Sequence, residues 1–85
     1  MNYMKKISDI LELTFGVDKS LITEENRRKS LFGTPFCMEG LQVVYFLMIV
    51  STEYKKKITL DAIEKYGLDS IDNVINWLEN TDTNL

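Results

Sequence analysis

Histidine is absent from this 85-residue chain, and cysteine, proline and tryptophan occur once each. A single cysteine cannot form an internal disulfide, so the fold must depend on packed apolar side chains, which suits a reducing, intracellular setting. The chain also lacks a cluster of metal-ligating residues and a glycine-rich phosphate loop. Without these groups and without histidine, we expect a protein that is not an enzyme and that holds no metal or cofactor.

Long apolar runs are also missing. The longest, Val43 to Val50, is far shorter than the roughly 20 residues of a membrane-spanning helix. Asp9 and Glu12 interrupt the N-terminal segment where a signal peptide would be apolar. The net charge of −3 argues against nucleic acid as a partner. We therefore expect one soluble, cytoplasmic domain over residues 1–85 that binds neither membranes nor nucleic acid.

The first predicted helix covers about residues 3–15. Apolar residues recur at three- and four-residue spacing, with charged residues between them: Met4, Ile7 and Leu11, and the pair Ile10 and Leu13. Gly16 is suited to end the helix. Residues 16–39 have no sustained periodicity and are predicted to form a long loop. Its apolar residues are expected to anchor the loop on the core: Val17, Leu21, Ile22, Leu31, Phe32 and Phe36.

The second predicted helix covers about residues 40–54 and contains LQVVYFLMIV, which is apolar on every face. The β-branched and aromatic residues would suit a buried strand, but the apolar character continues for longer than a typical strand. Leu41 to Thr52 carries no charge, so Tyr45, Phe46, Met48 and Ile49 cannot all face one small core. Either some of them contact a partner, or the long loop folds over them.

Two shorter helices complete the prediction. Residues 60–66 form a short third helix, with Thr59 as N-cap and Gly67 at its end. The fourth helix covers about residues 70–80, because apolar residues recur there at helical spacing. Either Asp69 or Ser70 is expected to be its N-cap, and the residues after Glu79 are expected to fray. The apolar series of the fourth helix is Ile71, Val74, Ile75 and Leu78.

This order of helices resembles that of acyl carrier proteins over nearly the whole chain. KKISDILELTFGVDKSLIT is similar to the first helix of carriers and the opening of their loop, and VVYFLMIVSTEYKKKITLDAIEKYG resembles their second and third helices. DSIDNVINWLE resembles the fourth helix. The resemblance implies an all-α, small four-helix acyl-carrier-protein-like bundle, with three main helices, a short third helix and a long loop after the first.

The attachment motif of that family is Asp-Ser-Leu at the start of the second helix, where the serine hydroxyl carries phosphopantetheine. The matching residues here are Glu39, Gly40 and Leu41. Glycine has no hydroxyl to esterify, so no phosphopantetheine is expected at this position. The sequence Asp69-Ser70-Ile71 looks like the motif, but too few residues follow it to hold three helices, and capping is the role that fits Ser70.

Carrier-like chains without the serine resemble the acyl-carrier-related proteins of bacterial peptide maturation systems. That membership implies a non-carrier protein-binding module, an accessory or scaffold subunit in peptide maturation or secondary metabolism. Its partners would be one or more proteins, such as biosynthetic or peptide-modifying enzymes. Two alternatives stay open: a genuine acyl or peptidyl carrier that uses another residue, and a self-associating helical domain that forms a homodimer. The interaction candidates are Leu41, Tyr45, Met48, Lys55, Lys56 and Lys57. The other attachment residues considered are Ser30, Thr34, Cys37 and Ser70.

Two further features have a plain and a functional interpretation. The basic clusters 27–29 and 55–57 would meet phosphate or an acidic partner if the fold brings them together, and are otherwise solvated charge. Cys37 precedes a predicted helix, where a thiol can become nucleophilic. Because it lies between Phe36 and Met38 and the chain has no histidine to activate it, we expect a small buried hydrophobic residue.

Overall fold

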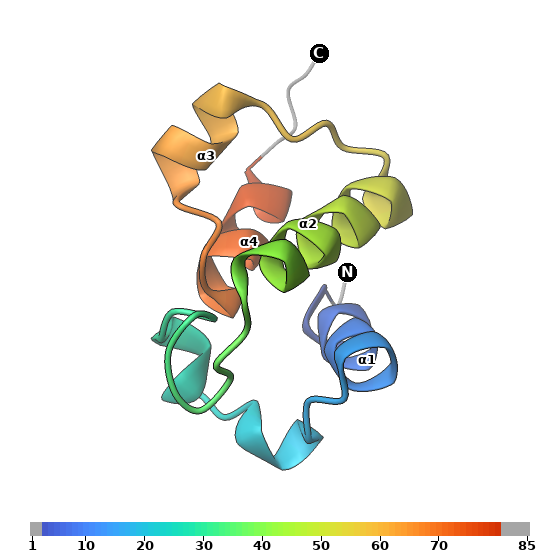
Figure 1. Ribbon diagram of the computed structural model, residues 1–85. Helices are drawn as coiled ribbons and strands as arrows, with labels where there is room; N and C mark the ends of the chain where they lie inside the picture. The colour runs from blue at the N-terminus through green and yellow to red at the C-terminus, as the bar shows by residue number, and fades with distance from the viewer. Residues whose placement is uncertain (1–2, 81–85) are drawn as a thin grey trace.

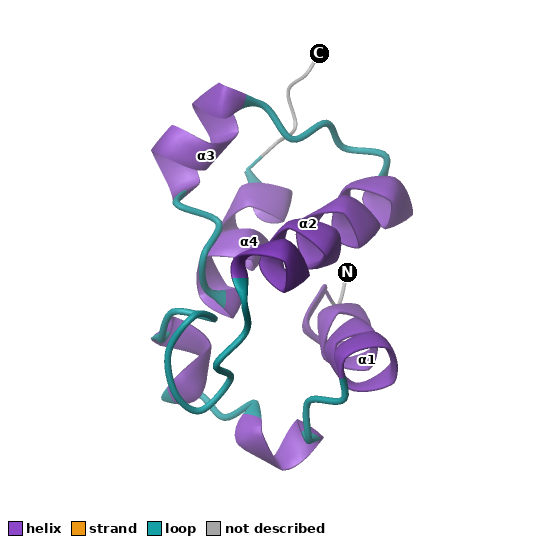
Figure 2. Cartoon of the chain, viewed as in Figure 1, coloured by secondary structure: helices purple, strands orange, loops and turns teal. Residues whose placement is uncertain are grey.

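The computed structural model describes residues 3–80, and within that range the chain is entirely helix and loop, as Figure 2 shows. This confirms the predicted all-α class for the described residues. Fraying was expected after Glu79, and apart from Asn80 those residues lie outside the described range. The elements are four α-helices and two short 3-10 helices: α1 (Tyr3–Phe15), η1 (Lys19–Leu21), η2 (Asn26–Arg28), α2 (Gly40–Tyr54), α3 (Leu60–Tyr66) and α4 (Ile71–Glu79).

Glycines end two of the helices. Gly16 follows α1 with φ 72°, and its N–H donates to the Glu12 carbonyl at 3.1 Å. Gly67 follows α3 with φ 83°, and its N–H donates to the Ile63 carbonyl at 2.9 Å. A side chain makes this left-handed backbone costly, so glycine is suited to both positions. At the start of α3, the Thr59 hydroxyl accepts a hydrogen bond from the Ala62 N–H at 3.1 Å.

The connection between α1 and α2 contains η1 and η2 and is tied to α4. The Leu31 N–H donates to the Asp69 carbonyl at 2.7 Å, just before α4 begins. Of the expected anchors, Val17, Leu31 and Phe36 are buried, and Leu21 and Ile22 are partly buried.

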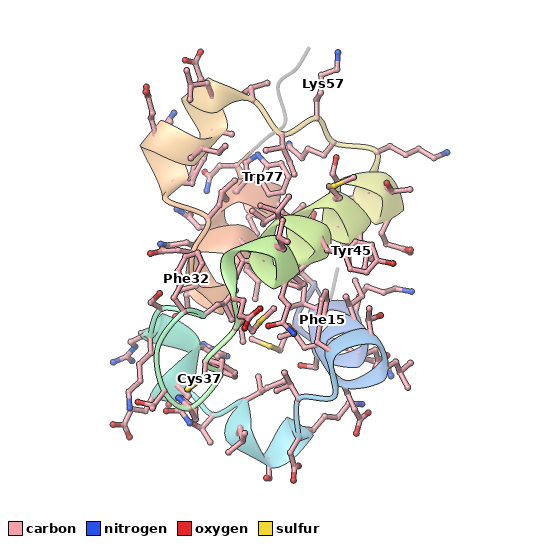
Figure 3. The ribbon with its side chains drawn as sticks, viewed as in Figure 1. Phe15, Phe32, Cys37, Tyr45, Lys57 and Trp77 are labelled. Carbon is pink, nitrogen blue, oxygen red and sulfur yellow. The ribbon has the colours of Figure 1, made fainter. Side chains whose placement is uncertain are left out.

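Phe32 was wrongly expected to be an anchor, since it is 51% exposed. Leu31 occupies the core instead, and the chain turns directly after it: the Gly33 N–H donates to the Ser30 carbonyl at 3.1 Å. In Figure 3 the Phe32 side chain lies at the surface of the molecule. The neighbouring leucine, not the larger phenylalanine, therefore fixes this part of the connection to the core.

One core joins all four α-helices and the connection. α1 packs against α2 and α4, and α4 also packs against α3 and η2. Figure 1 shows α3 at the opposite end of the molecule from η1, with α2 crossing between them. The largest fully buried side chains are Trp77, Phe46, Ile7, Leu11, Leu31, Leu68, Ile71, Val50 and Val74. Among residues 3–80, no helix is long and apolar enough to span a membrane.

Candidate interaction surfaces

The central helix α2 carries two apolar stripes. Its buried residues are Val43, Phe46, Leu47 and Val50, which recur at i, i+3, i+4 and i+7. That spacing places their side chains on one side of a helix. This stripe is the contribution of α2 to the core, and Phe46 and Val50 are fully buried within it.

The second stripe has the same spacing and is exposed. It consists of Leu41, Val44, Tyr45 and Met48, which are 84%, 53%, 54% and 57% exposed. Each of these residues lies two positions before a residue of the buried stripe. At about 100° per residue, two positions rotate a side chain roughly 200° around the helix, so the two stripes lie on opposite sides. We call these four exposed residues the apolar face.

The apolar face is held at one edge by an aromatic contact. The Tyr45 ring meets the Phe15 ring edge to face, with 5.7 Å between ring centroids, and Phe15 also meets the buried Phe46 ring at 6.2 Å. Figure 3 shows Tyr45 above Phe15, at the end of α1. The apolar face stays exposed, so the long connection does not fold over it. Phe36 packs into the core instead.

The start of α2 is the position that resembles the carrier attachment site. Gly40 is the first residue of the helix and Glu39 is its N-cap. The Glu39 N–H donates to Gln42 Oε1 at 2.8 Å, which satisfies one of the amides at the helix start. A Cβ atom added to Gly40 would meet nothing within 4 Å. A side chain would therefore fit at this exposed position without displacing its neighbours.

Ser70 is the N-cap of α4. Its Oγ accepts a hydrogen bond from the Asn73 N–H at 3.1 Å, and Ser70 is only 4% exposed. Asp69, the alternative cap, instead accepts a hydrogen bond from the Asn73 side-chain amide at 3.2 Å. The Ser70 hydroxyl is thus engaged and buried. A modifying enzyme would have to open the start of α4 to reach it.

Cys37 was expected to be buried, and this expectation was wrong because the residue is exposed. Its neighbours Phe36 and Met38 are both buried. Cys37 has a left-handed backbone, with φ 48°. A residue in this conformation turns the chain sharply, so Cys37 points outward between two inward-facing neighbours. Figure 3 shows it on the connection before α2.

The two basic clusters lie apart and have different surroundings. Arg27 Nε lies 3.1 Å from Asp72 Oδ1 on α4, and Lys29 Nζ lies 3.9 Å from Glu25 Oε2. Figures 1 and 3 show η2 and Lys57 at separate places on the molecule. Arg27 and Lys29 are therefore engaged locally, and the 27–29 cluster does not join the 55–57 cluster.

Lys55, Lys56 and Lys57 line a pocket of about 780 Å³ together with Lys65 from α3. We call it the lysine pocket. Its remaining walls come from the ends of α2 and α4, from α3 and from Tyr3. Asp61 is the one acidic residue among those that line it. The lysine pocket shares no residue with the apolar face.

The backbone turns at Lys55, where α2 ends beside the lysine pocket. Lys55 is the C-cap of α2 and has a left-handed conformation, with φ 53°. The Lys56 N–H donates to the Ser51 carbonyl at 2.9 Å, and the Ser51 hydroxyl donates back to the Lys56 carbonyl. These hydrogen bonds end the helix and fix the direction in which residues 55–57 continue from it.

Aromatic rings form the other part of the lysine pocket. Lys56 Nζ lies 5.8 Å from the centroid of the buried Trp77 ring, and Lys65 Nζ lies 5.4 Å from that of Tyr66. Both distances are within the range of cation–π attraction. Tyr54 also lines the pocket, and burial raises the pKa of its hydroxyl, with Glu53 adding to the effect. The Tyr54 side chain is therefore neutral at neutral pH.

The other pKa shifts belong to surface interactions of α1 and η1. A hydrogen bond from Lys19 to Asp9 at 2.7 Å lowers the pKa of the Asp9 carboxyl and raises the pKa of Lys19. Hydrogen bonds from Ser20 lower the pKa of Asp18, which caps η1. Ion pairing and capping thus account for these three shifts. Within the described part of the chain, no three histidine, cysteine or acidic residues are grouped so as to hold a metal.

Two residues of these surfaces were missed in the sequence. Val44 belongs to the apolar face. Its spacing of three residues from Leu41 and four from Met48 is the signal in the sequence that could have identified it. Lys65 belongs to the lysine pocket, and no local pattern links it to residues ten positions earlier. Its place depends on how α3 packs against α4.

No protein-family model, no curated protein and no solved structure matches this chain. The resemblance to acyl carrier proteins therefore rests on the order of the helices and on the quoted residues. The carrier-like fold and the role of the chain remain predictions.

Proposed function

We propose that this chain is a non-carrier, acyl-carrier-protein-like module that binds another protein through the apolar face of α2. The observation that carries the proposal is the exposed stripe of Leu41, Val44, Tyr45 and Met48 on a helix without charge from Leu41 to Thr52. A contiguous apolar stripe on the surface of a small domain is typical of a protein contact.

The shape of the apolar face indicates the partner surface. Residues at i, i+3, i+4 and i+7 are the usual anchors of a helix that lies in a hydrophobic groove. From Leu41 to Met48 the stripe extends along about 10 Å of helix. The partner therefore presents an apolar groove of about this length. The resemblance to carrier-related proteins of peptide maturation makes peptide-modifying or other biosynthetic enzymes the partner class.

The start of α2 supports a role without a prosthetic arm. The position that resembles the attachment serine is Gly40, and the phosphodiester of phosphopantetheine needs a side-chain oxygen there. The buried, hydrogen-bonded Ser70 is a poor substitute. Leu41, next to Gly40, is the most exposed residue of the apolar face. Apolar contact with a partner would therefore involve the same region of the helix as the position that resembles the attachment site.

Site-specific photocrosslinking in cells tests the apolar face. A benzophenone amino acid replaces Tyr45 in one variant and Leu13 in a control, since Leu13 is an 81% exposed residue on α1 outside the stripe. We expect one defined protein adduct from position 45 and none from position 13. The adduct should disappear when Met48→Glu is added, because a carboxylate would be buried in the contact.

The adduct is then identified and its affinity for the purified chain is measured. A partner that binds the unchanged chain and the Met48→Glu variant equally would contradict the proposal. An adduct of twice the mass of this chain would show that the apolar face contacts a second copy of the chain and not another protein. No specific adduct at position 45, together with a monomer at high concentration in sedimentation, would also contradict it.

A second experiment separates a carrier from a non-carrier. The chain is co-expressed with a broad-specificity phosphopantetheinyl transferase, and its intact mass is measured. We expect no added arm, and an arm on the unchanged chain would overturn the proposal. The Gly40→Ser variant tests the carrier resemblance, because a side chain fits at position 40. Modification of this variant alone would support the resemblance.

A further inference from the structure

One side chain of the apolar face can be changed by a mild oxidant. Leu41 and Val44 are hydrocarbons and Tyr45 is a phenol, whereas Met48 carries a thioether sulfur. Peroxides convert this sulfur to a sulfoxide, which turns a flexible apolar side chain into a polar one. Met48 is 57% exposed, so small oxidants in solution reach it.

The other methionines of the described chain are protected by their surroundings. Met38 is 5% exposed and belongs to the core. Met4 is partly buried against the core, and its Sδ accepts a hydrogen bond from the Ser8 hydroxyl at 3.6 Å. Met1 lies outside the described residues. Among residues 3–80, exposure therefore directs oxidation to Met48.

The position of Met48 gives its oxidation a consequence for binding. Met48 follows Leu41 by seven residues and Tyr45 by three, so it shares their side of α2. A sulfoxide oxygen enclosed in the apolar groove of a partner would lose its water without gaining a hydrogen-bond donor, which is unfavourable. In the free chain the same oxygen stays hydrated. Oxidation therefore weakens the contact and leaves the fold intact.

From these observations we infer that the apolar face is redox-sensitive, and that oxidation of Met48 by a peroxide releases the partner protein. The sulfur lone pair attacks one oxygen of hydrogen peroxide, so an S–O bond forms and the O–O bond breaks. The sulfur loses two electrons, the peroxide gains them, and a proton passes to the departing hydroxide to give water. This inference rests on the proposed function, because it concerns the regulation of the same surface.

Controlled oxidation of the purified full chain tests the selectivity for Met48. Cys37→Ser is introduced first, because Cys37 is the other exposed sulfur-bearing residue of the described chain. After treatment with hydrogen peroxide, fragmentation mass spectrometry locates the added oxygen. We expect it at Met48 before Met4 or Met38, with an unchanged circular dichroism spectrum. Oxidation of all three at equal rates would overturn the inference.

The effect on binding is measured with the partner that is crosslinked from position 45 and then purified. Once the peroxide has been removed, the oxidised chain should bind about tenfold more weakly than the unoxidised chain. Methionine sulfoxide reductases A and B should restore the affinity. Met48→Leu in the same Cys37→Ser chain is the matched control, because leucine is similar in volume and has no sulfur. Its affinity should stay within about twofold after the same treatment.

Equal affinities of the oxidised and unoxidised chains would overturn the inference and leave the proposed contact intact. An equal loss of affinity in the Met48→Leu control would also overturn it, because another residue would then be responsible. Failure of the proposed function gives a different result: the unoxidised chain would then yield no partner from position 45, and neither proposal would stand.

Discussion

The two sides of α2 have nearly the same composition and opposite surroundings. Phe46 on one side is fully buried, and Tyr45 next to it is 54% exposed. Both rings touch Phe15, so one aromatic residue of α1 borders both sides. The difference between the sides therefore comes from the packing of α1 and of the shared core against one side of the helix. Apolar character alone does not distinguish a core residue from a contact residue.

The largest effect is expected on the buried side. Phe46→Ala removes a fully buried ring and should lower the free energy of unfolding by about 3–5 kcal/mol, through lost apolar burial and the cavity that remains. Urea unfolding followed by circular dichroism measures this loss. Met48→Ala on the exposed side is the matched control and should change the value by at most about 0.5 kcal/mol. Similar losses in both variants would show that the two sides are equally packed.

A loss of intermediate size is expected at the start of α4. Ser70→Ala leaves the Asn73 N–H without its acceptor at a buried position, which should cost about 1 kcal/mol. Ser20→Ala is the control, because Ser20 is exposed and its hydroxyl caps no α-helix. Chemical denaturation of the two variants compares them. An unchanged midpoint for Ser70→Ala would mean that the cap adds nothing to stability. The intact masses of Ser70→Ala and the unchanged chain should differ only by the oxygen atom of the hydroxyl, with no added group on either.

A small gain is expected at the start of α2. Gly40→Ala adds a methyl group that meets nothing within 4 Å and restricts the unfolded chain, so stability should rise by about 0.4 kcal/mol or more. The same change at Gly67 should destabilise, since φ there is 83° and the new Cβ would lie 3.1 Å from Asn73 Nδ2. Thermal unfolding distinguishes the two. A destabilised Gly40→Ala variant would show that the start of α2 is not free to accept a side chain.

Little change in stability is expected when the apolar face is made polar. Val44→Ser with Met48→Ser should leave the free energy of unfolding within about 1 kcal/mol, because both side chains are already half exposed. The fluorescence of a dye that binds exposed apolar surface should fall at the same time. Leu13→Ser removes one isolated exposed residue on α1 and should leave the dye signal nearly unchanged. Equal dye binding by the unchanged chain and the double variant would argue against a continuous apolar face.

Helix ends could be predicted from the sequence because their signals are local. Thr59 and Ser70 accept hydrogen bonds from amides three residues later, and Gly16 and Gly67 have left-handed conformations that glycine adopts at lower cost than other residues. Each of these interactions lies within a few residues of the chain. Composition and spacing therefore contain the necessary information.

The path of the long connection could not be predicted in the same way. Leu31 and Phe32 are neighbours with similar hydrophobicity, and hydrogen bonds to distant parts of the chain distinguish them. The Leu31 N–H donates to the Asp69 carbonyl and the Leu31 carbonyl accepts from the Met38 N–H, whereas the Phe32 N–H donates to the nearby Ser30 hydroxyl. Cys37 points outward because of its left-handed backbone. That conformation is uncommon for a residue other than glycine, so it could not be expected from the sequence. The α2 pattern contained both stripes, but which one faced the core depended on the placement of α1. The lysine pocket depended on the placement of α3.

The outward position of Cys37 affects the chemistry of the protein in solution. Each molecule has a single accessible thiol, so air oxidation can join two chains and no more than two through a disulfide. Such a dimer would be linked through the connection before α2 and would leave the apolar face unpaired. It would dissociate in reductant, whereas a dimer formed through α2 would persist. The same thiol accepts one maleimide dye at a place distant from Lys57, as Figure 3 shows.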